Sequence, residues 1–354
     1  MKILHSYKTS WLFVLFFAAT ALANDGMVHL AGTVELIEDK KTNVSMKEEE
    51  IIITLHKDHY EIDVWFRFFN DGPNEKILIG FPATHIPVAA KINARDLEAA
   101  KKTMFRTYIN EKLLQPDEYT IKEEYPENSI GIRIWLLRQV EFKGNSYTTS
   151  RVIYKMPYSE AGGAFYAGYI YGTGRSWKGP IGKMSVVVKH GDDVMVGGVG
   201  EGFNELKKPT SFIWEANGRY RYVFENVEPK RKDDELTVPI VFFDSKYKFE
   251  CTDYGIFLCD LDRDFDGWYW SNNLLYKDPN DIMLFTKKQA RLFINYFFAI
   301  HGYEFKNPYY RDYFQKYYGG KYQVNPNFSE KNFNEFERKN IDFLLKMESM
   351  IPVE

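Results

Sequence analysis

The chain has 354 residues, enough for two or three domains, with 46 lysines and arginines against 49 aspartates and glutamates. Its net charge of -3 gives no indication of a general nucleic-acid binder. The hydrophobic fraction of 45% and the charged fraction of 27% exclude a disordered or fibrous chain, and the aromatic fraction of 17% favours β-structure.

Residues 1–23 have the pattern of a secretory signal peptide. Lys2 and Lys8 precede an apolar run of 12 residues from Trp11, and Ala21 and Ala23 are the small residues of a cleavage site. The run is shorter than the ~20 residues that span a bilayer, which favours cleavage over an uncleaved membrane anchor. We therefore expect an exported protein, periplasmic or extracellular, with no membrane span after cleavage.

Residues 24–244 alternate between apolar and polar positions, which is typical of strands with one buried face. Between Tyr60 and Phe68 every second residue is apolar, and Asn217-Gly218 separates two further alternating runs as a type I′ hairpin turn would. Further strands are predicted at 51–55, 105–114, 130–137, 147–156, 184–189 and 235–243. Many short strands at this spacing predict an all-β, sandwich-like N-terminal domain.

The pattern becomes helical after a connecting segment, residues 245–285. Thr286 and Gln289 have the spacing of a capping box, Gly302 is placed to end that helix, and Asn307 precedes a proline that begins the next. Ser329 is predicted to cap a third helix. Residues 286–351 therefore predict a small three-helix C-terminal domain.

The connecting segment contains the two cysteines of the chain, Cys251 and Cys259. Two cysteines eight positions apart in an oxidising compartment predict one disulfide. A loop that short constrains little of the unfolded chain, so the bond is expected to hold local geometry rather than the whole fold.

The helical region resembles the YARHG domain, a small module of exported bacterial proteins. The resemblance runs from about 280 to 348. It rests on the motif positions Phe298, Ala299, Ile300, His301 and Gly302, and on the flanking residues Asn295, Tyr303, Phe305, Tyr313, Phe314, Phe333, Glu337, Asn340, Ile341 and Leu344. Phe298 and Ile300 replace the tyrosine and the arginine of the motif, so any role of that arginine's charge is absent. The resemblance implies an extracytoplasmic interaction module without an assigned activity.

The N-terminal part resembles an uncharacterised family of exported bacterial β-proteins. The matching residues are Val44, Ser45, Met46, Glu49, Ile51, Phe69, Asn70, Gly80, Phe81, Pro82, Tyr171, Gly172, Thr173, Gly174, Trp177, Gly179 and Ile181. The resemblance implies a structural role for these glycines and aromatic residues, and no chemistry.

Asp262, Asp264 and Asp266 occupy alternate positions before Gly267, as the oxygen ligands of a calcium loop do. Position 12 of such a loop would be a bidentate glutamate, and here it is Asn273. The alternative is a solvated acidic turn. Calcium is therefore a possible bound ion, and no other cofactor is indicated.

Trp268 and Trp270 follow Gly267, and alternation places both on one side of the chain if the segment is extended. They are a possible stacking surface for sugars, or they seal the boundary between the two domains. His301 is placed to interact with the carbonyl groups at the end of its helix.

The sequence contains no Gly-x-Ser-x-Gly, His-Glu-x-x-His or P-loop motif, and no catalytic residue is identified. We therefore expect a non-enzymatic, exported protein that binds or assembles a component of the cell envelope, a protein or a glycan. The alternative is an envelope hydrolase that acts on glycan or peptidoglycan through a pair of acidic residues.

Overall fold

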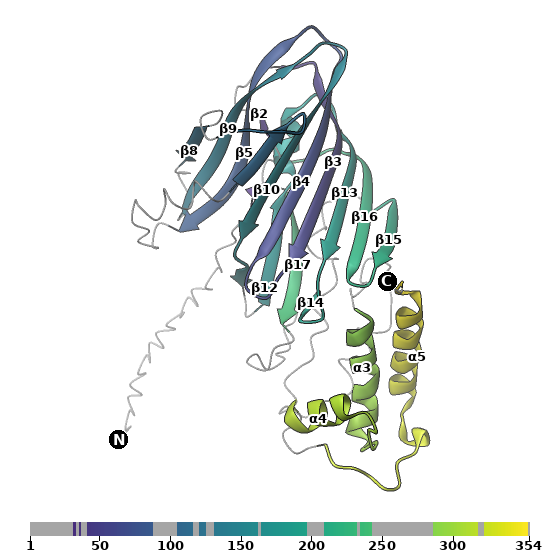
Figure 1. The fold of residues 1–354 in the computed structure, drawn as a ribbon. Helices are drawn as coiled ribbons and strands as arrows, with labels where there is room; N and C mark the ends of the chain where they lie inside the picture. Colours follow the sequence, from purple (N-terminus) through teal and green to yellow (C-terminus); the bar gives the residue numbers. More distant parts are fainter. Residues whose placement is uncertain are drawn as a thin grey trace, which may run out of the picture.

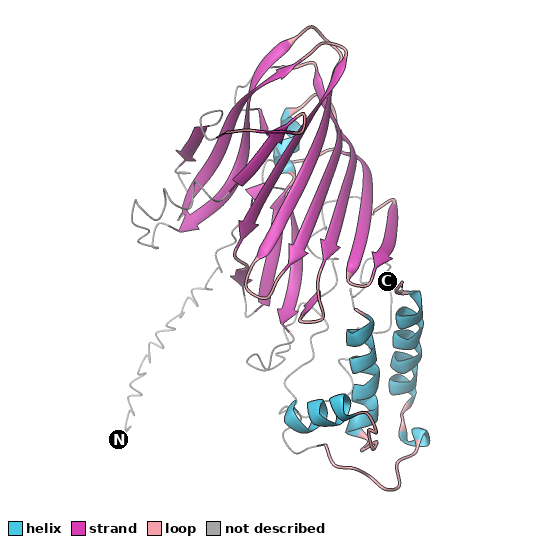
Figure 2. Ribbon diagram, in the orientation of Figure 1, coloured by secondary structure: helices cyan, strands magenta, loops and turns pink. Residues whose placement is uncertain are grey.

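The computed structural model describes residues 31–32, 35–36, 41–87, 105–115, 120–124, 131–161, 164–196, 209–231, 234–242, 286–317 and 322–352. A region of β-strands precedes three α-helices (Figure 1). The secondary structure therefore confirms the predicted fold class, an all-β domain followed by a small helical domain (Figure 2).

The largest sheet has eight strands in the order β15-β16-β13-β3-β4-β10-β6-β7. They are β3 (Val44–Leu55), β4 (Tyr60–Asn70), β6 (Phe105–Ile109), β7 (Lys112–Leu113), β10 (Ser146–Met156), β13 (Ile181–Lys189), β15 (Ser211–Ala216) and β16 (Arg219–Val227). Neighbouring strands are antiparallel except β13 and β3, which are parallel.

Two smaller sheets complete the domain. One contains β1 (Ala31–Gly32), β11 (Ser159–Ala161), β12 (Ala164–Ile170), β14 (Val194–Val196) and β17 (Glu235–Phe242). The other has the order β2-β5-β9-β8, formed by β2 (Glu35–Leu36), β5 (Glu75–Pro87), β9 (Gly131–Phe142) and β8 (Thr120–Glu124). A 3-10 helix, η1 (Gly172–Ser176), follows β12.

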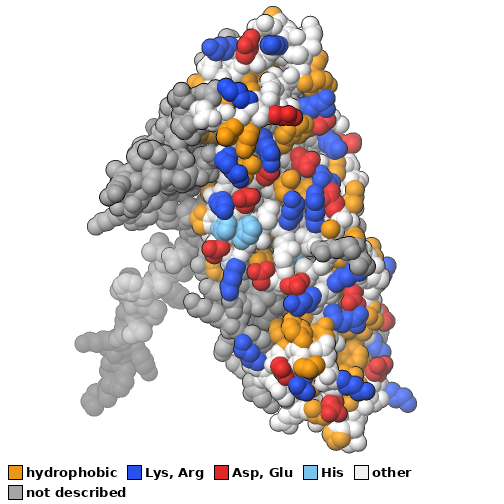
Figure 3. All heavy atoms as spheres, viewed as in Figure 1, with side chains coloured by type: hydrophobic (Ala, Val, Ile, Leu, Met, Phe, Trp, Pro, Cys, Tyr) orange, Lys and Arg blue, Asp and Glu red, His pale blue; other side chains and the backbone are white. Residues whose placement is uncertain are grey.

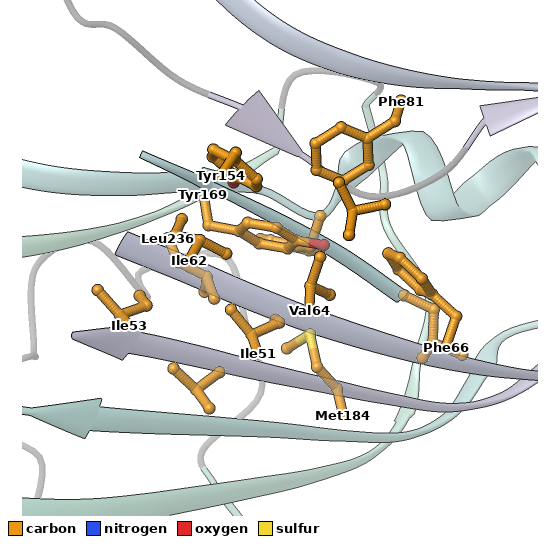
Figure 4. Packing of buried hydrophobic residues seen from close by; sticks show 14 of the residues in the cluster. Ile51, Ile53, Ile62, Val64, Phe66, Phe81, Tyr154, Tyr169, Met184 and Leu236 are labelled. Carbon is orange, nitrogen blue, oxygen red and sulfur yellow. The ribbon is translucent and has the colours of Figure 1, made fainter. Parts of the chain in front are cut away.

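The core lies between the large sheet and the smaller ones. On β4 the residues Tyr60, Ile62, Val64, Phe66 and Phe68 are fully buried, as their alternation predicts. Figure 4 shows inward side chains of the large sheet against residues of both smaller sheets. The alternating pattern therefore marks the buried face of the strand correctly.

The predicted hairpin joins β15 to β16, but its turn is not type I′. Gly218 has a φ of +69°, whereas Asn217 is not among the residues with positive φ, and the register shifts between Trp214 and Ala216. A type I′ turn needs positive φ at both central residues. A Cβ on Gly218 would lie 2.3 Å from the carbonyl oxygen of His190, so this position requires glycine.

The helical domain contains α3 (Lys287–Ile300), α4 (Pro308–Tyr317), a 3-10 helix η3 (Glu330–Asn332) and α5 (Glu335–Met350). Asn307 Oδ1 accepts a hydrogen bond from Tyr309 N at 2.9 Å at the start of α4. Gly302 has a φ of +78° after α3, as predicted. Ser329 caps only η3, and α5 begins later with Asn334 as its cap. A second capping box at Asn334 accounts for the later start.

Candidate functional site

Most of the predicted site residues lie outside the described residues. These are the aspartates Asp262, Asp264 and Asp266, the cysteines Cys251 and Cys259, and the tryptophans Trp268 and Trp270. The motif from Phe298 to Gly302 is described, and it lies at the end of α3. The site is therefore built from the helical domain and its junction with the β-domain.

The start of α3 is attached to the β-domain by buried hydrogen bonds. Gln289 caps the helix with Thr286, and its Nε2 also donates to the carbonyl oxygens of Val194 at 2.8 Å and Asp192 at 3.1 Å. Thr286 Oγ1 donates to Asp192 Oδ1 at 2.7 Å. Both capping side chains are 2% exposed. The residues that start the helix therefore also fix its position on the β-domain.

The hairpin turn provides a further attachment. Asn217 Oδ1 accepts a hydrogen bond from the backbone N–H of Lys287 at 2.9 Å. The first N–H groups of a helix have no partner within the helix, so this side chain satisfies one of them. Trp214 of β15 packs against both the β-domain core and the helical core. This hairpin thus serves as a docking element for the helical domain.

The motif residues have mainly structural contacts. The ring of Phe298 lies 5.0 Å from that of Phe333 and 5.5 Å from that of Tyr303, measured between centroids. His301 Nε2 is 3.0 Å from Glu337 Oε1 of α5, so this histidine links two helices in addition to ending its own. Ile300, at the motif's arginine position, is 46% exposed.

A group of tyrosines on α4 is the clearest surface feature near the junction. This tyrosine patch consists of Tyr309, Tyr310 and Tyr313; the centroid of Tyr309 lies 5.1 Å from that of Tyr310 and 6.3 Å from that of Tyr313. Tyr309 is 44% exposed. Burial raises the pKa of Tyr310, so its hydroxyl is neutral and able to donate at neutral pH.

A lysine connects the tyrosine patch to the junction. Lys288 Nζ lies 5.3 Å from the centroid of the Tyr309 ring and 3.3 Å from Asp192 Oδ2. A cation over an aromatic ring is attracted by the negative face of the ring. Lys288 therefore connects Tyr309 of the patch to Asp192 of the β-domain.

Exposed apolar side chains are concentrated in the helical domain. Among the described residues eight large hydrophobic side chains are exposed, and five of them are in this domain: Ile300, Tyr309, Val324, Leu345 and Met350. Figure 3 shows apolar side chains between the charges over this part of the molecule. These residues belong to α3, α4, α5 and the segment between α4 and η3.

The outer face of the large sheet is different. Arg151 forms a two-pronged pair with Asp63 at 2.7 and 2.6 Å, and Arg67 contacts Glu48 at 3.2 Å while its guanidinium lies 4.0 Å from the Tyr147 ring centroid. Cross-strand pairs of opposite charge stabilise a solvated sheet face. We interpret this face as structural.

The described ranges contain no group of three or more His, Cys, Asp or Glu residues arranged to hold a metal ion. The predicted calcium loop lies outside these ranges. In the same described part of the chain, no helix has the length and apolar character needed to cross a membrane.

The sequence matches no protein-family model and no curated protein, so the resemblance to the YARHG domain stays a prediction. Among solved structures, a Legionella pneumophila protein described as a "putative nutrient binding protein" is 16% identical with a TM-score of 0.48, over 91% of this chain and 99% of that protein.

Two further solved structures have lower TM-scores. An M1 zinc metallopeptidase from Deinococcus radiodurans is 10% identical over 56% of this chain, with a TM-score of 0.29. Yeast LTA4 hydrolase also is 10% identical over 56%, with a TM-score of 0.29. The matched region spans 42% of the first protein and 29% of the second.

Proposed function

We propose that the mature protein is an exported, non-enzymatic protein that binds or assembles a component of the bacterial cell envelope, and that its helical domain provides the binding surface. The observation that carries the proposal is the tyrosine patch, exposed at Tyr309 and held by Lys288 and Asp192. Export through the signal peptide and the resemblance to an interaction module support the same function.

The chemistry of the patch suits a glycan or a peptide. A tyrosine ring offers a large apolar face and a hydroxyl, with only two rotatable side-chain bonds to order on binding. Lys288 adds a positive charge beside the ring, and the fixed junction removes part of the ordering cost of binding.

Sedimentation with purified peptidoglycan sacculi tests this proposal. We expect the mature protein to pellet with sacculi and Tyr309→Ser to lower its affinity about tenfold, as loss of an exposed aromatic contact of ~1.4 kcal/mol would. The matched control is Tyr147→Ser, which removes a tyrosine that is 52% exposed on the β-domain. Equal affinity of wild type and Tyr309→Ser would rule out the patch, and failure of the wild type to pellet would rule out the cell wall as the partner.

The calcium hypothesis for Asp262, Asp264 and Asp266 is tested in the same assay. If the loop binds calcium and supports the binding surface, a chelator reduces pelleting of the wild type. The variant Asp264→Asn then shows the same reduced pelleting with and without chelator. If a chelator does not change the pelleting of the wild type, calcium binding by the loop does not contribute to this function.

A further inference from the structure

Two strands joined by a tight turn separate into different sheets. β9 pairs with β5 and β8, whereas β10 pairs with β4 and β6. Where the two strands diverge, Arg138 of β9 faces Ser150 of β10, and Arg138 Nη2 donates to Ser150 Oγ at 2.7 Å. A polar contact therefore bridges the inner faces of the two sheets.

Arg138 is only 1% exposed and is the largest fully buried side chain among the described residues. Its Nε and Nη1 atoms are buried and have no hydrogen-bond partner. The residues beside it on the same face are Leu136 and Val140 of β9 and Ile79 of β5, all buried and apolar. Three of the five guanidinium N–H groups thus point into surroundings that offer no acceptor.

Burial lowers the pKa of Arg138 to about 9, which still leaves the side chain charged at neutral pH. A buried charge is stabilised only when an opposite charge and hydrogen bonds compensate for the loss of water. In the described residues no carboxylate is paired with Arg138, and its one hydrogen bond is to a neutral hydroxyl. Arg138 is therefore a positive charge that needs an anion.

A second buried hydroxyl lies near this contact. Thr107 of β6 is 1% exposed, and its Oγ1 has no hydrogen-bond partner. Thr107 pairs with Val152, and Ser150 pairs with Ile109, so Thr107 is the diagonal neighbour of Ser150 on the inner face. Three strands thus bring one guanidinium and two hydroxyls to the place where the sheets diverge.

We propose that Arg138, Ser150 and Thr107 form a buried binding site for the carboxylate of a small organic acid with an apolar body. The planar guanidinium fork matches the two oxygens of a carboxylate, and the hydroxyls can donate to the same oxygens. One guanidinium neutralises one negative charge, so a dianion such as sulfate would bring an uncompensated charge among apolar side chains. This site belongs to the β-domain and is separate from the tyrosine patch.

Thermal unfolding of the full mature protein tests the site, with butyrate or hexanoate replacing chloride at constant ionic strength and sulfate as a further anion. We expect the carboxylates to raise the unfolding midpoint of the wild type saturably, and sulfate to raise it less. Arg138→Met should abolish this increase. The matched control is Arg151→Met, which removes an exposed arginine and should retain the increase.

The carboxylate-free buffer gives an independent measurement. There Arg138→Met should unfold at the same temperature as the wild type or at a higher one, because methionine removes a buried charge without a counter-ion. A lower midpoint would show that buried water or backbone groups already satisfy the guanidinium, and the proposal would be wrong. An equal response of Arg138→Met and wild type to carboxylates would also overturn it.

Calorimetric titration with butyrate or hexanoate keeps the test valid if Arg138→Met does not fold. Thr107→Val preserves the shape of the side chain and removes only the hydroxyl. We expect one binding event per wild-type chain and a several-fold weaker affinity for Thr107→Val. Absence of carboxylate binding to the wild type, or unchanged affinity in Thr107→Val, would contradict the assignment of these residues.

Discussion

The outer face of the large sheet and the surface of the helical domain differ in the exposed side chains that they carry. On the sheet, Arg67 and Arg151 are each matched to a carboxylate on the neighbouring strand. On the helices, Tyr309, Leu345 and Met350 leave apolar surface in water. Cross-strand charge pairs keep a broad sheet face soluble, whereas exposed apolar side chains gain free energy when a partner covers them. The difference supports the proposal that the helical domain, rather than this sheet face, binds a partner.

The largest expected effect comes from removing one buried phenylalanine from each of the two hydrophobic cores. Phe68 is fully buried against Trp177 and Phe142 in the β-domain, and Phe314 is fully buried in the helical domain. Replacing Phe68 by alanine should lower the free energy of unfolding of the β-domain by about 3–5 kcal/mol, because it removes packing and leaves a cavity. Phe314→Ala should destabilise the helices by a similar amount.

Urea unfolding followed by tryptophan fluorescence and by far-ultraviolet circular dichroism measures both changes. Among the described residues every α-helix, α3, α4 and α5, is in the C-terminal domain, so the circular dichroism signal of these helices reports on that domain. Separate transitions that shift one at a time would confirm two folding units. A single transition shifted equally by both variants would show that the junction couples the domains into one unit.

A smaller effect is expected at Asp234, where β17 begins. Its side chain accepts hydrogen bonds from the backbone N–H groups of Lys230 at 2.6 Å and Arg231 at 3.0 Å, and from Arg231 Nε at 3.2 Å. Its carbonyl oxygen accepts from Tyr171 and Gly172, which attaches η1 to the sheet. Burial acts to raise the pKa of Asp234, but the hydrogen bonds from Arg231 and Lys230 outweigh it and lower the pKa.

The sign of the pH dependence follows from this lowered pKa. The contribution of the charged carboxylate is fully present above the unfolded-state pKa of about 3.9 and is lost as the pH falls through the lower folded-state value. Asp234→Asn should therefore cost ~2 kcal/mol at pH 7, and the difference from wild type should shrink below pH 4. Urea unfolding at several pH values measures this. A difference that does not shrink as the pH falls from 4 to 2 would argue against the charged form as the source.

The smallest expected effect comes from removing the cap residue of either capping box. Thr286 caps α3 inside the junction and donates to Asp192, whereas Asn334 caps α5 at an exposed position. Loss of an N-cap costs roughly 0.5–2 kcal/mol, and we expect Thr286→Ala near the upper end and Asn334→Ala near the lower end. Only Thr286→Ala should increase hydrogen exchange at the Asn217 turn. Equal exchange in both variants would mean that the cap does not hold the junction.

Part of the site was predictable because its signals are local. The capping box of Thr286 and Gln289 and the end of α3 at Gly302 depend on residues within one turn of the helix, and the structure contains both. The sequence predicts Ser329 as the cap of the third helix, but in the structure it caps only the short helix η3. A serine is a favourable cap for a short helix as well as a long one, and the capping box that begins α5 is at Asn334, five residues later. The tyrosine patch was not predicted, since Tyr309 is exposed only by the way α4 packs.

Arg138 of the proposed buried site shows most clearly which features the sequence does not predict. Alternation places Arg138 on the same face of β9 as Leu136 and Val140, but arginine is rarely a buried residue, and nothing in the sequence indicates its partner. In the structure Arg138 is 1% exposed and donates to Ser150, 12 positions further along the chain. Likewise, the sequence predicts Gln289 only as a capping residue. In the structure its side chain also donates to the carbonyl oxygen of Asp192, which is 97 residues away in the chain.

The sequence by itself determined the main strands of the large sheet, the three C-terminal helices, the cap of α3 and which face of β4 is buried. These features follow from side-chain periodicity and from hydrogen bonds between residues close in the chain. The tertiary structure alone decided which polar groups lose water, which tyrosines remain exposed and which residues join the two domains. Those outcomes depend on how the sheets diverge and how the helices dock, because solvation is a property of the assembled fold.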